Sequence, residues 1–258
     1  MKVALTIAGS DPTGGAGAQS DLRVFHHFAV YGLSVLSALT AQNTLKVSAV
    51  SAVRGDLLEE QLNTLLNDIR PDALKTGLLF SMDAIMTAAK IIRAHDLRNV
   101  VIDPVIVSST GTDLMERGAL DIMKKDLLPL ARVITPNIAE ASALSGVRIS
   151  DEEDIEEAAR ALKQFGPEVI VITGGHLPAA KEHETLELIY DGKDFHRIRG
   201  KKIKGEYHGT GCAFSAAITA LLARGSSVTD AVRQAREFMD KAIKNAHSIG
   251  KGMKLLDV

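Results

Sequence analysis

The chain has 258 residues, of which 46% are hydrophobic and 24% charged, so it is long enough to bury a large core and lies in the range that α/β proteins span as one domain. A formal net charge of −2 at pH 7 gives no electrostatic reason to expect a nucleic-acid partner, and the apolar runs are too short for a membrane span. The single cysteine, Cys212, excludes an intrachain disulfide and a multi-cysteine metal site, which favours the reducing cytoplasm.

Strand-like apolar runs alternate with helical patterns along the chain, as is typical of βαβ units. Some of these runs are apolar on both faces, which indicates a parallel sheet covered by helices. The predicted strands are 2–8, 33–40, 47–53, 73–76, 99–105, 132–135 and 169–173. The predicted helices are 18–30, 56–69, 82–95, a segment after Asp113, 138–144 and 152–165. The fold class is therefore α/β, in layers, with a mostly parallel central sheet.

The last third of the chain departs from this alternation. Short strands are expected between residues 185 and 203, on either side of the turn Asp191-Gly192, so this edge of the sheet is predicted to be antiparallel. Helices at 213–224 and 229–248 follow. Because no repeat, low-complexity tract or linker interrupts the sequence, we expect a single domain over residues 1–258.

The sharpest local signal is His208-Gly209-Thr210-Gly211-Cys212, which stands directly before a helical run. Glycines let the backbone approach a ligand, and the free amides at a helix N-terminus favour an anion such as a phosphate. The segment is a candidate anion hole for phosphoryl transfer. The same position predicts a lowered pKa for Cys212, whose thiolate would act as a base. The alternative is a glycine-rich turn that starts a helix, with Cys212 as a small buried apolar residue.

A second glycine-rich segment, residues 9–17, follows the first strand and precedes a helix, which is the context of a ligand-binding loop. It is not a P-loop, because no Gly-Lys-Ser/Thr follows at the required spacing. Its glycines also do not place G-x-G-x-x-G in register with the helix start, as a dinucleotide site requires. The alternative is a flexible connection.

Two acidic side chains follow predicted strands. Asp103 closes one strand in Asp103-Pro104-Val105, and Glu140 follows another in Thr135-Pro136-Asn137-Ile138-Ala139-Glu140. Ligands of open α/β sheets bind beyond the carboxyl ends of the strands, so both acids would face one crevice. Magnesium favours one or two carboxylates together with waters and substrate phosphates, which makes the two acids candidate ligands. The alternatives are a turn-forming aspartate and a glutamate in the first turn of a helix.

Short segments recur in a fixed order along the chain, each of them weak by itself. They are AGSDPTGGAG (8–17), TAQNT (40–44), KTG (75–77), DPV (103–105), TPN (135–137), GGH (174–176) and HGTGC (208–212). Together they resemble the hydroxymethylpyrimidine/phosphomethylpyrimidine kinases, and the resemblance extends to about residue 252. It implies a ribokinase-like αβα sandwich, ATP and Mg²⁺ as cofactors, a homodimer, and two sequential phosphorylations of 4-amino-5-hydroxymethyl-2-methylpyrimidine on the way to thiamine diphosphate.

The resemblance also implies roles for individual residues. Gln42 matches the residue that hydrogen-bonds the aminopyrimidine, and its amide can donate and accept in one plane. The other residues that match the substrate pocket are Gly9, Asp21, Leu78 and Val105. Those that match the anion hole and the catalytic position are Gly209, Thr210, Gly211 and Cys212. Those on the nucleotide side are Asn137, Thr173 and Gly175, together with Gly209 and Thr210, and those on the magnesium side are Asp103 and Glu140.

The chain departs from the family pattern at three places. Leu78 stands where the family usually has methionine, a volume-conserving change. Thr173 stands where a lysine usually precedes Gly-Gly-His, which removes a cation that would help to hold nucleotide phosphate, so Lys75, Lys201 or Lys202 is expected to compensate. The segment 250–254 lacks the usual glycine- and proline-rich finish, which leaves the C-terminal edge of the site open.

Two other functions stay open at this point. Pyridoxal kinases of the same cysteine-bearing clade use a nearly identical framework, and Gln42-Asn43-Thr44 favours the pyrimidine without excluding the pyridine. The other is a non-catalytic ligand sensor on this fold, which the change at Thr173 suggests. The presence of Asp103, Glu140 and Cys212 argues against the sensor.

Overall fold

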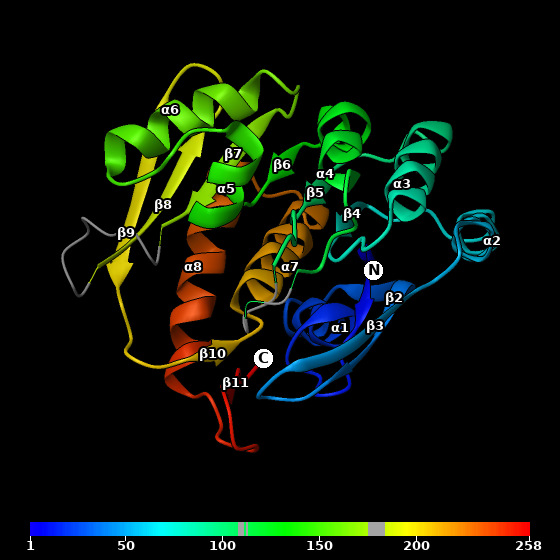
Figure 1. The fold of residues 1–258 in the computed structure, drawn as a ribbon, viewed down its shortest axis with the longest axis horizontal. Helices are drawn as coiled ribbons and strands as arrows, with labels where there is room; N and C mark the ends of the chain where they lie inside the picture. Colours follow the sequence, from blue (N-terminus) through cyan, green and yellow to red (C-terminus); the bar gives the residue numbers. More distant parts are fainter. Residues whose placement is uncertain (108–110, 112, 175–183) are drawn as a thin grey trace.

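The computed structural model describes residues 1–107, 111, 113–174 and 184–258, and its centre is a nine-stranded sheet (Figure 1). The strand order is β3-β2-β1-β4-β5-β6-β7-β8-β9, and neighbours from β2 to β7 pair in parallel. The strands are β1 (Val3–Ser10), β2 (Tyr31–Gln42), β3 (Val47–Ala52), β4 (Ala73–Thr76), β5 (Val100–Ile102), β6 (Val133–Ile134), β7 (Val169–Thr173), β8 (Glu184–Tyr190) and β9 (Phe195–Lys201). The predicted α/β class with a mostly parallel sheet is confirmed.

Both edges of the sheet are antiparallel. The pairing of β7 with β8 and of β8 with β9 confirms the antiparallel edge expected around Asp191-Gly192. The antiparallel pairing of β3 with β2 was not expected from the sequence. Only Asn43 to Lys46 connect these two strands, and a connection this short cannot make the crossover that a parallel neighbour needs. The side chain of Asn43 holds the turn by accepting hydrogen bonds from the amides of Leu45 and Lys46.

Helices cover both faces of the sheet and form two separate apolar cores. Successive residues of a strand point to opposite faces, so Val100 and Ile102 of β5 enter one core and Val101 enters the other. The helices of the second core are α1 (Gly17–His27), α7 (Thr210–Ala223) and α8 (Val228–Lys244). Those of the first are α2 (Gly55–Leu66), α3 (Met82–Ala94), α5 (Ile138–Ser145), α6 (Glu152–Lys163) and α4 (Ala119–Ile122), which continues as a π-helical turn (Met123–Leu127) and a 3₁₀ turn (Leu128–Leu130). The architecture is thus a three-layer αβα sandwich.

Helix α7 is the central helix of its layer. Every residue from Ala213 to Ala223 is buried, because the helix carries small and mostly apolar residues on all sides and packs against the sheet, α1 and α8. It begins at Thr210, three residues before the predicted start, so the glycine-rich motif forms its first turn. Among the described residues, no helix combines the length and the apolar character that crossing a bilayer requires.

The C-terminal segment returns to the loop that precedes α7. Strand β11 (Lys254–Leu255) pairs in parallel with β10 (Tyr207–His208), and the sequence predicted neither strand. The amide of Gly252 donates to Oγ1 of Thr44 at 3.1 Å, and the amide of Met253 donates to the Thr44 carbonyl at 3.0 Å. The C-terminal segment 252–255 therefore connects the β2–β3 turn with the residues that precede α7. It makes these contacts although it lacks the glycine- and proline-rich C-terminal sequence that is usual in the family.

Candidate functional site

The residues singled out from the sequence meet at the carboxyl ends of the parallel strands, as expected for this class of sheet. They follow or end β1, β2, β4, β5, β6 and β7, and α7 starts beside them. In chain order they are Gly9, Gln42, Leu78, Asp103, Val105, Asn137, Glu140 and Thr173, with Gly209 to Cys212 at the helix start. Gly175 lies outside the described residues.

The two glycine-rich loops pack against each other. Gly209 caps α7 with φ +79°, and a Cβ built on it would meet the carbonyl oxygen of Gly15 at 1.8 Å, so only glycine fits. The backbone of Gly17 donates a hydrogen bond to the sulfur of Cys212. These contacts join residues 9–17 and 208–212 into one surface.

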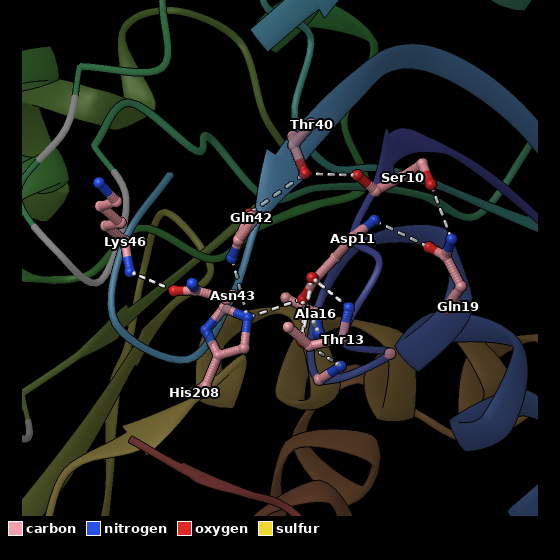
Figure 2. Close-up of polar contacts among 12 residues, drawn as sticks. Ser10, Asp11, Thr13, Ala16, Gln19, Thr40, Gln42, Asn43, Lys46 and His208 are labelled. Carbon is pink, nitrogen blue, oxygen red and sulfur yellow. Dashed lines mark hydrogen bonds and ion pairs between the residues drawn. The ribbon is translucent and has the colours of Figure 1, made fainter. Parts of the chain in front are cut away.

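Asp11 fixes the conformation of the first loop (Figure 2). Its carboxylate accepts hydrogen bonds from the amides of Thr13 and Ala16, each at 2.9 Å, and lies 2.7 Å from Nε2 of His208. Burial acts to raise the pKa of Asp11, but the interactions with His208 and with the amide and hydroxyl groups of Thr13 together outweigh it, so the pKa lies below its usual value. The segment is therefore held by its own aspartate and does not fit the alternative of a flexible connection.

The first turn of α7 offers a place for an anion. The amides of Thr210, Gly211 and Cys212 belong to the first turn of a 14-residue helix, where no carbonyl of the same helix can accept from them. Gly211 is exposed, and a Cβ built there would meet no atom within 4 Å, so the helix start is open on this side. The position combines free donors with the positive end of the helix dipole, which suits a phosphate group.

The pKa of Cys212 moves in the direction opposite to that expected from the sequence. Burial raises the pKa of its thiol to about 12, and the positive charge of Lys75 opposes this only in part. The carboxylates of Asp103 and Asp21 add to the rise, because negative charges disfavour a thiolate. The prediction of a lowered pKa is therefore wrong, since it considered the helix dipole and neither the burial of the thiol nor the acids that the fold brings to the same place. The catalytic role of Cys212 stays a prediction.

Lys75 lies at the centre of these acids and is fully buried. Its ammonium group is 2.6 Å from Oδ1 of Asp21, 3.3 Å from the carbonyl oxygen of Cys212 and 3.9 Å from Oδ2 of Asp103. Burial opposes the charge of Lys75, but Asp21, Cys212 and Asp103 together outweigh it and raise the pKa of the lysine. The ammonium group of Lys75 is thus buried and paired with Asp21 and Asp103. It is not available to replace the lysine that the family has at the position of Thr173. Lys201 and Lys202 are exposed at the end of β9.

Asp21 is fully enclosed beneath the loop. Its Oδ2 accepts a hydrogen bond from Oγ1 of Thr6 at 2.6 Å, and its Oδ1 faces Lys75. Burial raises the pKa of Asp21, against the effect of Lys75. The structure therefore places Asp21 as the support of Lys75, and the substrate contact implied by the family resemblance stays a prediction.

Asp103 and Glu140 are both buried and influence each other. Oδ2 of Asp103 accepts a hydrogen bond from Ser215 of α7 at 2.8 Å, so its side chain points away from its own turn. Burial raises the pKa of Asp103, whereas Lys75 and Ser215 oppose the rise. Burial and then the carboxylate of Asp103 raise the pKa of Glu140 to about 8. Two buried acids that repel each other fit a divalent cation, which would relieve the repulsion.

Glu140 also has the helix-start role that was weighed as its alternative. Its Oε2 accepts from the Asn137 amide at 2.9 Å, and the Asn137 side chain accepts from the Glu140 amide at 3.0 Å, which together form a capping box. Asn137 in turn pairs with Thr173 in an isolated parallel bridge. The two predicted nucleotide-side residues are thus adjacent. Within the described residues, no group of three or more His, Cys, Asp or Glu side chains is arranged to hold a metal ion.

A small apolar cluster unites three of the predicted substrate residues. Leu78 packs with Ala38 and Leu114, and Val105 contacts the same cluster. A Cβ built on Gly9 would come within 2.9 Å of Cδ2 of Leu78, so a larger residue at position 9 would displace that leucine. The cluster gives this end of the site an apolar wall.

Three residues to which the sequence analysis gave no role, Glu187, His208 and Arg236, lie at or next to the site. Arg236 of α8 pairs with Glu187 at 3.0 Å, and Glu187 is the cross-strand neighbour of Thr173, where the family has its lysine. His208 and Gln42 meet through their Nε2 atoms at 3.0 Å (Figure 2). His208 was visible only as the first residue of a motif, because 166 positions separate it from Gln42 and only the fold joins them.

A family model described as phosphomethylpyrimidine kinase matches residues 11–257. The chain belongs to this family. The hydroxymethylpyrimidine/phosphomethylpyrimidine kinase of Bacillus subtilis is 39% identical over 250 residues, which cover 96% of this chain and 92% of that protein. The thiamine biosynthesis bifunctional protein ThiED of Geobacter sulfurreducens is 43% identical over 249 residues, which cover 96% of this chain and 50% of that protein, so the chain spans half its length. The predicted family and the prediction of a phosphotransferase are confirmed.

A solved structure with the same fold is that of a kinase named for a different substrate. The pyridoxal kinase from Staphylococcus aureus in complex with AMP-PCP and pyridoxal superimposes with a TM-score of 0.90 at 36% identity, covering 100% of this chain and 93% of that one. Its ligands are an ATP analogue and a pyridine, whereas the B. subtilis and G. sulfurreducens relatives are named for pyrimidine or thiamine chemistry.

Proposed function

We propose that the protein is an ATP-dependent kinase that phosphorylates 4-amino-5-hydroxymethyl-2-methylpyrimidine and then its monophosphate, for thiamine diphosphate synthesis in the cytoplasm. The observation that carries the proposal is the placement of Gln42, the apolar cluster of Leu78 and Val105, and the open start of α7 along one edge of the sheet. Gln42 supplies a planar donor and acceptor for the aminopyrimidine edge. The cluster covers the apolar part of the ring.

The proposed phosphate chemistry uses the start of α7 and the two acids. The amides of Thr210, Gly211 and Cys212 would stabilise the charge of the transferred phosphoryl group, and such positioning and charge stabilisation supply most of the catalysis in phosphoryl transfer. Asp103 and Glu140 would hold Mg²⁺ together with ATP phosphates and waters, and the ion would neutralise phosphate charge. Asn137 and Thr173 would lie on the nucleotide side.

Pyridoxal is the second candidate substrate, because the superimposed S. aureus kinase binds it. The deciding experiment measures ADP formation with hydroxymethylpyrimidine, its monophosphate and pyridoxal as separate acceptors, with and without Mg²⁺. We expect turnover with both pyrimidines, dependent on Mg²⁺, at a higher kcat/KM than with pyridoxal. A preference for pyridoxal would assign the second candidate, and binding of acceptors without ADP formation would assign a sensor. Light scattering of the same sample tests the expected homodimer.

Substitution of Gln42 locates the pyrimidine pocket. We expect Gln42→Ala to raise the KM for hydroxymethylpyrimidine by at least about tenfold and to leave the KM for ATP within about twofold, because a site built to pair with a buried polar ring edge loses affinity when one partner is removed. Gln42→Glu, of the same shape, keeps the acceptor but loses the donor and serves as the matched control. Equal weakening of both substrates would mean that Gln42 is structural.

A further inference from the structure

Gln42 belongs to a chain of polar contacts that joins β2, the loop after β1 and β10 (Figure 2). Its Nε2 lies 3.0 Å from Nε2 of His208, and the same histidine nitrogen lies 2.7 Å from Oδ2 of Asp11. Its Oε1 lies 3.4 Å from Oγ1 of Thr40, which donates to the carbonyl oxygen of Ser10 at 2.8 Å. Two neighbours therefore flank the carboxamide, and each has a fixed hydrogen-bonding character.

The histidine neighbour is a donor. The carboxylate of Asp11 already accepts from two backbone amides, and an ionised carboxylate can only accept, so Nε2 of His208 carries the proton between them. The opposite tautomer would point a lone pair at a carboxylate oxygen 2.7 Å away. It would also bury an Nδ1–H group, and Nδ1 of His208 has no hydrogen-bond partner among the described residues. A donor at Nε2 cannot bond to the NH₂ group of Gln42.

The threonine neighbour is an acceptor. A hydroxyl group has one proton, and a carbonyl oxygen cannot supply one, so the 2.8 Å contact uses the proton of Thr40 on Ser10. Thr40 then has only lone pairs for Gln42 and needs an N–H group from it. Both neighbours therefore demand the same arrangement of the amide, in which the oxygen faces the histidine and the nitrogen faces the threonine.

We propose that the carboxamide of Gln42 is held with Oε1 toward His208 and Nε2 toward Thr40, half a turn from the orientation drawn in Figure 2, and that His208 and Thr40 are the positioning residues that hold it. The oxygen and the nitrogen of a carboxamide differ little in size, so the half turn needs no additional space. In this arrangement the Nε2–H group of His208 donates to both Asp11 and Oε1 of Gln42. The NH₂ group of Gln42 donates to Oγ1 of Thr40, which donates to the carbonyl oxygen of Ser10.

The consequence for the substrate rests on the proposed function. With these bonds made, Gln42 has one N–H and one oxygen lone pair left for a ligand. Rotating the carboxamide of Gln42 by half a turn exchanges the positions of its N–H donor and its oxygen acceptor. The rotation therefore determines the orientation in which the edge of a heteroaromatic ring binds. An exocyclic amine is matched on the His208 side and a ring nitrogen on the Thr40 side. His208 and Thr40 thereby contribute to specificity without contacting the ring.

The orientation is testable in the ligand-free protein by NMR. In isotope-labelled protein, the signals of Gln42 and His208 are identified by their loss in Gln42→Met and His208→Gln. We expect the His208 ring to be protonated at Nε2, and the Gln42 NH₂ protons to give stronger nuclear Overhauser effects to the Thr40 methyl group than to the His208 ring. Stronger effects to the ring, or a ring protonated only at Nδ1, would overturn the proposal. This result does not depend on which substrate the enzyme uses.

Kinetics separate positioning from a general structural role. Thr40→Val keeps the shape but removes the acceptor, so we expect the KM for hydroxymethylpyrimidine to rise about fivefold while kcat and the KM for ATP change less than about twofold. Thr40→Ser restores the hydroxyl group and is expected to recover most of the affinity. Equal rises in both KM values, or no recovery in Thr40→Ser, would contradict the positioning role. If wild type does not use the pyrimidine, the proposed function fails, and the NMR measurement still decides the orientation.

Discussion

A half-buried thiol illustrates how the chemistry of single residues depends on neighbours that are remote in sequence. From the sequence, Cys212 is a cysteine at a helix N-terminus, and such thiols ionise readily. In the fold, burial raises the pKa of the thiol to about 12, and the carboxylates of Asp103 and Asp21, which lie around Lys75, add to the rise. The position of the residue could be predicted from its motif. The sign of its pKa shift could not, because the fold alone determines the burial of the thiol and brings in the acids from α1 and from the end of β5.

The raised pKa makes Cys212 a slow nucleophile at neutral pH. With a pKa of about 12, the thiolate fraction at pH 7 is about 10⁻⁵, whereas an ordinary cysteine has a few per cent. The rate of alkylation by iodoacetamide should therefore rise about tenfold per pH unit from pH 7 to pH 10, without a plateau. Mass spectrometry of the protein measures it directly, since Cys212 is the only cysteine. A plateau near pH 7 would mean that the thiol is activated.

The base role of Cys212 predicts a difference between the two phosphorylations. The first acceptor is an alcohol that must lose its proton, whereas the second is a phosphate oxyanion that is already ionised at neutral pH. We expect Cys212→Ala to slow the alcohol step by about 10²–10⁴-fold and to spare the monophosphate step. Because the pKa is high, the thiolate and with it the alcohol step should increase with pH in wild type but not in the variant.

Single-turnover rates for each acceptor provide the measurement. Cys212→Ser, which keeps the size of the side chain and a group that can accept the hydrogen bond from Gly17, is the matched control for the shape of the helix start. If Cys212→Ala lowers both steps by one factor, the residue acts through the geometry of the anion hole, and the base role is wrong.

At the scale of elements, the sequence predicted the strands and helices whose periodicity is clear and missed those set by contacts. The hairpin around Asp191-Gly192 was predicted from its turn residues, and the structure confirms it. The pair β10–β11 was missed, because a two-residue strand has no periodicity and is defined only by its partner. The direction of β3 was missed because its apolar run does not encode direction. The observed start of α7, Thr210, lies before the predicted start at residue 213. The prediction excluded the glycines because of their low helix propensity, whereas here they form the first turn.

The loop of residues 9–17 yields a stability prediction. Asp11 has a folded pKa below the ordinary value of 3.8, so its bonds add stability above about pH 3.8, and this stability is lost as the pH falls through the folded pKa. We expect Asp11→Asn to lower the free energy of unfolding by about 2 kcal/mol at pH 7, since hydrogen bonds to charged groups contribute about that amount. Urea unfolding at pH 7 and pH 3 should show the difference shrinking toward acid.

An exposed aspartate supplies the control for this series. Asp68 is exposed, and Asp68→Asn should change the free energy of unfolding by less than about 0.5 kcal/mol at either pH. If the Asp11→Asn difference were the same at pH 7 and pH 3, its cause would be packing and not the charge of the carboxylate.

At the scale of the whole molecule, the fold class was predictable and the arrangement of the strands was not. Alternation of apolar runs and helices predicts layers, but β1 is flanked by β2 and β4, and nothing in strands apolar on both faces specifies that order. The order matters because it places Thr6 of β1 and Lys75 of β4 side by side, between α1 and α7. The strand order thus brings Lys75, Asp21 and Asp103 together in a buried cluster, which no sequence motif predicts.

This cluster couples the sheet to the helices of one layer, and its removal should be costly. Lys75→Met leaves the buried carboxylates of Asp21 and Asp103 without their cation, so we expect the free energy of unfolding to fall by about 3–5 kcal/mol. Asp21→Asn alone retains the hydrogen bond from Thr6 and should cost less. In the double variant Lys75→Met/Asp21→Asn, one of the two stranded charges is gone, so part of the loss should be recovered, with a coupling energy of about 1–3 kcal/mol. Urea unfolding of the three variants and wild type, followed by circular dichroism, completes the cycle. Strict additivity of the two single changes would show that Lys75 and Asp21 do not stabilise each other, and that the lysine is retained for its contact with the start of α7.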